Sequence, residues 1–195
     1  MDTLLAICLG IGLSAACGFR VFVPLLVMSV ASLSGHLTLA PGFQWIGTYP
    51  ALVTFSAATV VEIGGYYIPW VDHLLDTMAT PAAIVAGTVV TAAMVSNMSP
   101  MLKWTLAAIA GGGAAGLVQG TTVLARGVST ATTGGLGNPF FATIELGGAF
   151  FTSILALVAP LLAVGLIAVV LFVLGRKIMR KTRNTPPTPV QPGVT

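Results

Sequence analysis

Long apolar stretches are the feature that most restricts what this chain can fold into. Several of them run for about 15 to 35 residues, and the longest covers residues 140–174. Only 7% of the residues are charged, against about 25% in an ordinary soluble domain. Strands of a membrane barrel would alternate apolar and polar residues, and these stretches do not. The sequence therefore predicts an all-α integral membrane protein.

The first and last stretches are too long to be read as single simple spans. Thr3–Ser32 is long enough for one tilted helix or for a broken one. Phe140–Leu174 would extend about 52 Å as one helix, across a hydrocarbon core of about 30 Å. Because proline removes a helix hydrogen bond, we expect this last stretch to break at Pro160.

The remaining stretches bring the expected number of membrane-embedded helical elements to about six. Thr80-Pro81 has the residue types that begin a helix. The Gly-, Ser- and Thr-rich segment Gly127–Asn138 is expected to form either a re-entrant loop or an exposed connection. The expected spans between the first and last stretches are Tyr49–Ile68, about 81–96, and Leu102 to about Ala125.

The chain contains only two glutamates, and their surroundings match. Glu62 and Glu145 each begin a Glu-x-Gly-Gly motif with aliphatic and aromatic neighbours. An arginine precedes each motif, and a proline is expected to begin the span that follows each motif. Because each copy would contain three spans, the second copy would enter the membrane from the opposite side. We therefore expect a 3+3 inverted-topology repeat formed by residues 1–98 and 99–175, the alternative being chance recurrence in a glycine-rich chain.

The charged residues within the apolar stretches are the first functional candidates. An unpaired charge at mid-membrane costs about 2.5–3.5 kcal/mol, so these side chains are expected to pair with one another. The resulting cluster would either line a pathway for an ion or solute or join helices as a structural ion pair, and an arginine could also extend to the headgroups. The four residues are Arg20, Glu62, Arg126 and Glu145.

A second candidate group is Asp72, His73 and Asp76, in which two carboxylates flank an imidazole. On a helix the carboxylates would share one face. The group could hold a divalent metal or relay protons, or it could be a solvated connection at the interface. The sequence identifies no particular metal and no cofactor.

Small residues recur at every fourth position on two stretches. Such a face lets two membrane helices approach closely, so these positions predict helix packing. The first face contains Gly10, Ser14 and Gly18, and the second contains Gly112, Gly116 and Gly120.

The positive charge of the chain is concentrated at its C-terminal end. Residues 176–195 carry five basic residues and no acidic one, whereas residues 1–175 sum to −2. A basic cluster directly after an apolar helix is typical of a cytoplasmic anchor near anionic lipid and disfavours the alternative, nucleic-acid binding. The Pro-rich residues beyond it are expected to form a disordered tail. With six spans, both termini would lie in the cytoplasm.

Several motifs resemble those of a known family. They are Gly18-Phe19-Arg20, the run Tyr67-Ile68-Pro69-Trp70-Val71-Asp72, Asp76 and Thr80-Pro81. The family comprises small bacterial multi-pass membrane proteins catalogued as a domain of unknown function, and the resemblance covers most of residues 5–175. It implies membrane residence and no known substrate. We expect the membrane to be the bacterial inner membrane. A lysine often precedes Ile-Pro in that family, and Tyr67 stands here instead, so any role of that lysine does not carry over.

The sequence favours the first of two functions, and the second is the alternative. The first is a small transporter or channel-like protein for an ion or solute, with the four buried charges near the pathway. The second is a lipid- or quinone-binding accessory subunit of a membrane assembly. A polar cavity at the level of Glu62 and Glu145 would favour the first, and an acyl-shaped apolar groove would favour the second. No catalytic motif indicates an enzyme, and the expected partners are membrane lipid and other membrane chains, including copies of this one.

Overall fold

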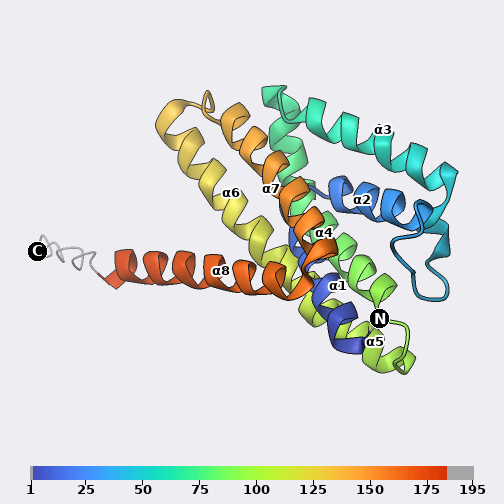
Figure 1. Ribbon diagram of the computed structural model, residues 1–195. Helices are drawn as coiled ribbons and strands as arrows, with labels where there is room; N and C mark the ends of the chain where they lie inside the picture. The colour runs from blue at the N-terminus through green and yellow to red at the C-terminus, as the bar shows by residue number, and fades with distance from the viewer. Residues whose placement is uncertain (1, 184–195) are drawn as a thin grey trace, which may run out of the picture.

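The structure, a computed structural model, describes residues 2–183 of the chain (Figure 1). The described residues form helices joined by turns and short connections, and no strand occurs among them. The predicted all-α fold is confirmed. Three helical segments are long and apolar enough to cross a membrane: Thr77–Met94, Pro100–Thr133 and Asn138–Val158. The shorter apolar helices are Thr3–Cys17, Phe22–Leu33 and Pro160–Val173.

Four helices form the centre of the molecule. Figure 1 shows α1 and α6 running from lower right to upper left, while α4 and α7 run back. The α1 helix packs against the other three, and its Leu9 and Leu13 are fully buried. The four helices are α1 (Thr3–Cys17), α4 (Pro69–Met94), α6 (Gly113–Thr133) and α7 (Asn138–Val158).

Two further helices lie beside this centre. The helices α2 (Phe22–Leu33) and α3 (Tyr49–Gly65) pack on each other and are joined by a connection that contains the short 3-10 helix η1 (Gln44–Gly47). Thr48 begins α3 by accepting a hydrogen bond from the Ala51 amide. Although α3 and α4 are consecutive in the chain, they make little direct contact. This separation leaves room for the groove described below.

The first apolar stretch is a broken helix. It stops at Cys17 and resumes at Phe22, so residues 18–21 form the break between α1 and α2. At Gly18 an added Cβ would lie 2.5 Å from the carbonyl oxygen of Ala115 and 2.6 Å from Cβ of Val118, both on α6. Only glycine fits so close an approach, and the break is therefore fixed against α6.

The third span does not begin where the sequence predicted. The prediction that Thr80-Pro81 opens a helix at about 81–96 is wrong, because α4 begins at Pro69 and continues through Pro81 to Met94. Pro69 takes the first helical turn, where its missing N–H is no loss. A proline inside a membrane helix is tolerated because neighbouring helices and local adjustments satisfy the freed backbone groups.

The fourth span is longer than predicted, and it changes from α-helix to π-helix and back. It comprises α5 (Pro100–Leu106), the π-helix η2 (Ala107–Gly112) and α6. The segment Gly127–Asn138 forms neither expected loop, because it is helical to Thr133 and only residues 134–137 turn. Gly134 and Gly135 provide the positive φ values of that turn, +64° and +90°.

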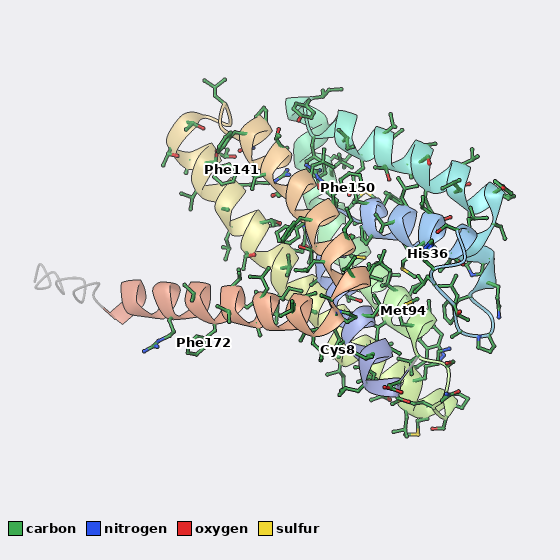
Figure 2. The ribbon with its side chains drawn as sticks, viewed as in Figure 1. Cys8, His36, Met94, Phe141, Phe150 and Phe172 are labelled. Atoms are coloured by element: carbon green, nitrogen blue, oxygen red, sulfur yellow. The ribbon has the colours of Figure 1, made fainter. Side chains whose placement is uncertain are left out.

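The last stretch breaks at Pro160, as predicted. The α7 helix ends at Val158, and α8 (Pro160–Arg183) leaves the other helices after its first turns (Figure 1). Ala163 is buried near Gly12 of α1, whereas Phe172 projects away from the bundle (Figure 2). The basic residues 176–183 continue α8, and the Pro-rich residues 184–195 lie outside the described residues.

The two predicted repeats share one interior. The α1 helix belongs to residues 1–98 but packs among α6, α7 and the first part of α8, which belong to residues 99–175. An inverted repeat requires equivalent helices to run in opposite directions. In Figure 1 the two Glu-x-Gly-Gly helices, α3 and α7, do so, whereas α1 and α6 run the same way. The inverted repeat stays a prediction.

Candidate functional site

The four charged residues singled out in the sequence meet at one place. Arg20 lies in the break between α1 and α2, Glu62 near the end of α3, Arg126 on α6 and Glu145 on α7. All four are buried, with 2% to 8% of their surface exposed. Their formal charges sum to zero, so the interior carries no net charge from this cluster.

Glu145 is shared by the two arginines. The Nε of Arg126 donates to Oε1 of Glu145 at 2.9 Å, and Nη2 of Arg126 donates to Oε2. The Nη2 of Arg20 lies 3.6 Å from the same Oε2 and donates to the carbonyl oxygen of Ala142 at 2.9 Å. A two-point arginine–carboxylate pair fixes orientation as well as distance. The pair therefore ties α6 to α7 and positions Arg20 against both.

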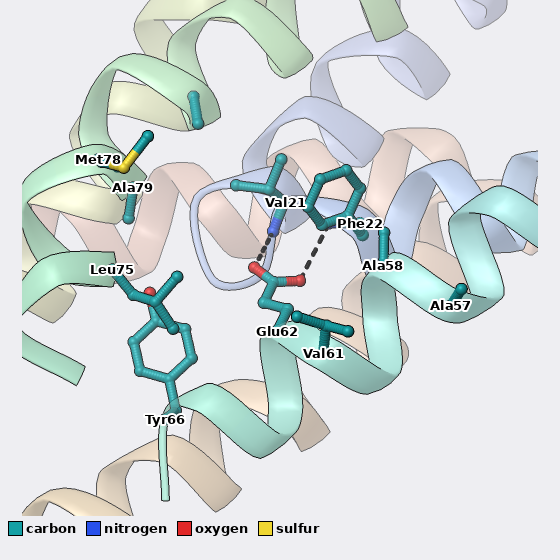
Figure 3. Close-up of a pocket in the computed structure, with 11 residues that line it drawn as sticks. Val21, Phe22, Ala57, Ala58, Val61, Glu62, Tyr66, Leu75, Met78 and Ala79 are labelled. Carbon is teal, nitrogen blue, oxygen red and sulfur yellow. Dashed lines mark hydrogen bonds between the residues drawn. The ribbon is translucent and has the colours of Figure 1, made fainter. Parts of the chain in front are cut away.

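Glu62 bonds to backbone rather than to an arginine. Its two carboxylate oxygens accept hydrogen bonds from the amides of Val21, at 2.8 Å, and Phe22, at 3.1 Å (Figure 3). These amides stand at the start of α2, where a helix has no internal acceptors for its N–H groups. A negative charge is also favourable at that end of the helix dipole. Glu62 of α3 therefore caps α2, whose own cap residue supplies no side-chain hydrogen bond.

Tyr66 joins the two arginines. Its ring centroid lies 3.8 Å from Cζ of Arg20 and 4.1 Å from Cζ of Arg126. Such distances are typical of cation–π contacts. Tyr66 follows the last residue of α3, four positions after Glu62. The C-terminal end of α3 therefore places both the carboxylate that caps α2 and the ring that contacts the guanidinium groups. The Nε and Nη1 atoms of Arg20 have no hydrogen-bond partner among the described residues.

An apolar groove reaches Glu62 from between α2, α3 and α4. One cavity, of about 480 Å³, is lined by Glu62, Tyr66 and apolar residues of the three helices (Figure 3). A second, of about 560 Å³, shares lining residues with it and extends to Trp45 and Val89. Together they follow α4 from Leu75 to Val89, a distance of about 21 Å. Glu62 is the one charged residue among the described side chains that line them.

The second candidate group lies on one helix. Asp72, His73 and Asp76 all lie on the first turns of α4, as the helical alternative required, but their side chains lie outside the described part of the structure. Among the described residues, no three His, Cys, Asp or Glu side chains gather as they would around a metal ion.

Five of the six predicted packing positions lie at close helix contacts. Ser14 donates to the carbonyl oxygen of Gly87 at 2.6 Å. An added Cβ would come within 2.5 to 3.1 Å of a neighbouring helix at Gly10, Gly18, Gly112 and Gly116. Gly120 differs, because nothing lies within 4 Å of its added Cβ. The small-residue face of α6 therefore ends at Gly116.

Sequence reasoning missed Tyr66 and the groove. Tyr66 could have been found, because the residue four positions after Glu62 faces the same side of a helix. The amides of Val21 and Phe22 also follow from placing a helix break beside Arg20. The groove has no comparable sequence signal, since it depends on how far α3 lies from α4.

The comparisons with known proteins identify a family and no function. The family catalogued as a domain of unknown function, DUF4126, matches residues 7–180. The match confirms the resemblance to an uncharacterised family that the sequence motifs indicated. No curated protein and no solved structure matches the chain.

Proposed function

We propose that this chain, which belongs to the DUF4126 family, is a membrane protein that binds a long amphiphilic molecule, a lipid or a quinone. The binding site in this proposal is the groove between α2, α3 and α4. The observation that carries it is the lining of the groove: the cavity that reaches Glu62 is apolar and elongated. An apolar groove is the feature that favours lipid binding over ion transport.

The size of the groove supports the proposal. Ligand sites usually enclose about 300–1,000 Å³ and combine apolar walls with a few polar groups. The two adjoining cavities have about 480 and 560 Å³, and Glu62 and Tyr66 supply polar atoms at one end. Their common length along α4 suits a chain-like molecule better than a compact one.

In this proposal the charge cluster is a scaffold. The pair between Arg126 and Glu145 joins α6 to α7, and Glu62 holds the start of α2. Of these two contacts, the one from Glu62 fixes the start of α2, which lines the groove. The protein has no catalytic role in this proposal.

The second candidate is a pathway for a small ion or solute through the same cluster. It is favoured by one observation: two nitrogen atoms of the buried Arg20 have no hydrogen-bond partner among the described residues. A flux of protons, monovalent cations or anions through the purified protein in liposomes, lost in Glu62→Gln, would support this candidate over lipid binding.

The experiment for lipid binding blocks the groove. Ala82 is exposed and lines both cavities, so Ala82→Phe fills their common part without disturbing the buried core. Ala131→Phe is the matched control, because Ala131 is exposed on α6 and does not line the groove. The full-length protein is labelled in detergent with a photoactivatable long-chain alcohol, and the labelled peptides are identified by mass spectrometry.

We expect labelling on α2 and α4 in the wild type and in Ala131→Phe, and its loss in Ala82→Phe. Equal labelling of these helices in Ala82→Phe and in the wild type would overturn the proposal. So would labelling confined to α8, since exposed apolar residues there contact any lipid.

We also propose that the chain lies in a bacterial inner membrane with both termini in the cytoplasm. The basic residues at the end of α8 support this orientation. Six membrane-embedded elements would return the chain to the same side. So would four crossings, in which α1 joins the three helices that are long and apolar enough to cross a membrane. Lipid or another membrane chain, including a second copy, is the proposed partner for the exposed apolar residues of α8.

A further inference from the structure

We infer that the polar end of the ligand held beside Glu62 is neutral and carries a hydroxyl group. The ligand class is then a long-chain alcohol, a quinol or a diacylglycerol, rather than an anionic phospholipid or a cationic lipid. This inference rests on the proposed function, because it concerns the ligand of the same groove. The observation that carries it is a carboxylate with unused acceptor capacity in an apolar wall.

Glu62 can accept further hydrogen bonds. Each carboxylate oxygen has two lone-pair positions, and the amides of Val21 and Phe22 occupy one on each oxygen. The remaining positions can accept from a ligand that enters the groove, which Glu62 lines (Figure 3). The polar end of such a ligand must therefore be a hydrogen-bond donor.

An anionic head is disfavoured because no cation lines the groove among the described side chains. Arg20 and Arg126 lie next to the groove but do not line it, and the ring of Tyr66 contacts both guanidinium groups while it lines the cavity. A phosphate at this end would meet the charge of Glu62. Repulsion between like charges is strong where apolar walls lower the effective dielectric constant.

A cationic head is disfavoured because the charge of Glu62 is already compensated. The four charges of the cluster sum to zero, and the two amides at the start of α2 bring a partial positive charge to the carboxylate. A cation entering the groove would lose its water without meeting a net negative charge among the described side chains. A hydroxyl group loses much less hydration and gains a hydrogen bond to a charged acceptor.

The orientation of the ligand's apolar chain follows from the two cavities. The cavity with Glu62 lies at one end of the groove, and the cavity with Trp45 and Val89 extends it. The hydroxyl end therefore lies at Glu62, and the apolar chain follows α4 past Ala82 toward Trp45.

The test compares four probes that have the same hydrocarbon chain and different polar ends. Geranylgeraniol, its acetate, its monophosphate and the corresponding primary amine are added to the full-length protein in detergent, and the bound fractions are measured by native mass spectrometry. The acetate lacks the hydroxyl donor, the phosphate is anionic and the amine is cationic. Because a hydrogen bond to a charged group changes affinity by about tenfold or more, we expect the alcohol to bind at least about tenfold tighter than each of the others.

The variant Glu62→Gln tests the origin of this preference. Its amide carries no charge, so the preference for the alcohol over the phosphate should fall by about tenfold. Asp2→Asn is the matched carboxylate-to-amide control, because Asp2 is exposed at the start of α1 and does not line the groove. If Glu62→Gln does not fold, the affinities of the wild-type protein for the four probes still test the inference.

Two results separate the inference from the proposed function. Phosphate or amine binding as tight as the alcohol, and lost in Ala82→Phe, overturns the inference and keeps the groove as the lipid site. Failure of all four probes to bind, or equal binding in Ala82→Phe, overturns both.

Discussion

Arg126 and Glu145 lie on consecutive helices and form a two-point ion pair inside the bundle. The Nε of Arg126 donates to Oε1 of Glu145 at 2.9 Å, and Nη2 donates to Oε2. Only 3% and 7% of the two side chains are exposed, so both charges are buried. Removing Arg126 or Glu145 alone leaves the four-residue cluster with a net charge, whereas removing both leaves Arg20 and Glu62, whose charges still sum to zero.

Single and double substitutions of Arg126 and Glu145 should therefore differ in their effect on the free energy of unfolding. Arg126→Gln and Glu145→Gln should each lower the free energy of unfolding by about 3–5 kcal/mol, and the double variant should lose less than the sum. The measurement is thermal unfolding in detergent. Additive losses would show that the two side chains do not interact.

The same double variant distinguishes a scaffold from a pathway. If the charges are structural, it should regain both stability and lipid binding. A stable double variant that binds lipid would remove these two residues from any transport pathway. In liposomes, an ion flux present in the wild type and absent from the stable double variant would give them that role.

Glu62→Ala should destabilise the protein more than Glu62→Gln. The alanine variant leaves the amides of Val21 and Phe22 without an acceptor, whereas glutamine keeps one carbonyl oxygen for them. We expect a loss of about 2 kcal/mol for alanine and less for glutamine. Hydrogen exchange at the start of α2 should increase in the alanine variant, and unchanged protection there would contradict the capping role.

Gly18→Ala and Gly120→Ala compare a glycine in close contact with a neighbouring helix and a glycine with open space beside it. An added Cβ at Gly18 meets the carbonyl oxygen of Ala115 at 2.5 Å, whereas at Gly120 nothing lies within 4 Å. Gly18→Ala should cost about 1–3 kcal/mol through overpacking. Gly120→Ala should be neutral or stabilising by up to about 1 kcal/mol, because alanine is the better helix former. Equal melting temperatures for the two variants would contradict this packing.

Tyr66→Leu should destabilise the protein more than Tyr66→Phe. Phenylalanine keeps the ring that contacts the guanidinium groups of Arg20 and Arg126, and leucine removes it. The difference should be about 1–2 kcal/mol for two buried cation–π contacts. Comparable melting temperatures for the two variants would show that the ring itself contributes little.

Reporter fusions at the two ends test the proposed orientation. The five basic residues between Arg176 and Arg183 should keep the C-terminus in the cytoplasm, and an even number of crossings places the N-terminus there too. A cytosol-active reporter should work at both ends. A periplasmic N-terminus with a cytoplasmic C-terminus would mean an odd number of crossings.

The sequence predicted those features that depend on local chemistry. Long apolar stretches required membrane helices, and the excess length of 140–174 required the break found at Pro160. The high cost of isolated charges in the membrane also predicted that the four charged residues pair with one another. Arg126 and Arg20 lie beside Glu145, whereas Glu62 bonds to backbone amides instead.

The features that the sequence did not predict depend on packing between distant segments. Pro81 resembled a helix start, but α4 continues through it. Residues 127–133 resembled a loop by composition, yet they extend α6, whose Arg126 and Ser129 are buried in the interior. Local propensity is a weak guide where burial of one helix face decides the outcome.

The π-helix η2 sets the rotational register of the helix that follows it. A π turn holds an extra residue compared with an α turn, so α6 is rotated by about 100° relative to a continuous α-helix of the same length. Arg126 faces Glu145 with this rotation included. Deleting one residue from Ala107–Gly112 should therefore let the segment rewind as an ordinary α-helix with Arg126 still facing inward, whereas the same deletion between Gly113 and Arg126 would turn it away. A variant of this chain that is one residue shorter within this segment should therefore keep the ion pair between Arg126 and Glu145.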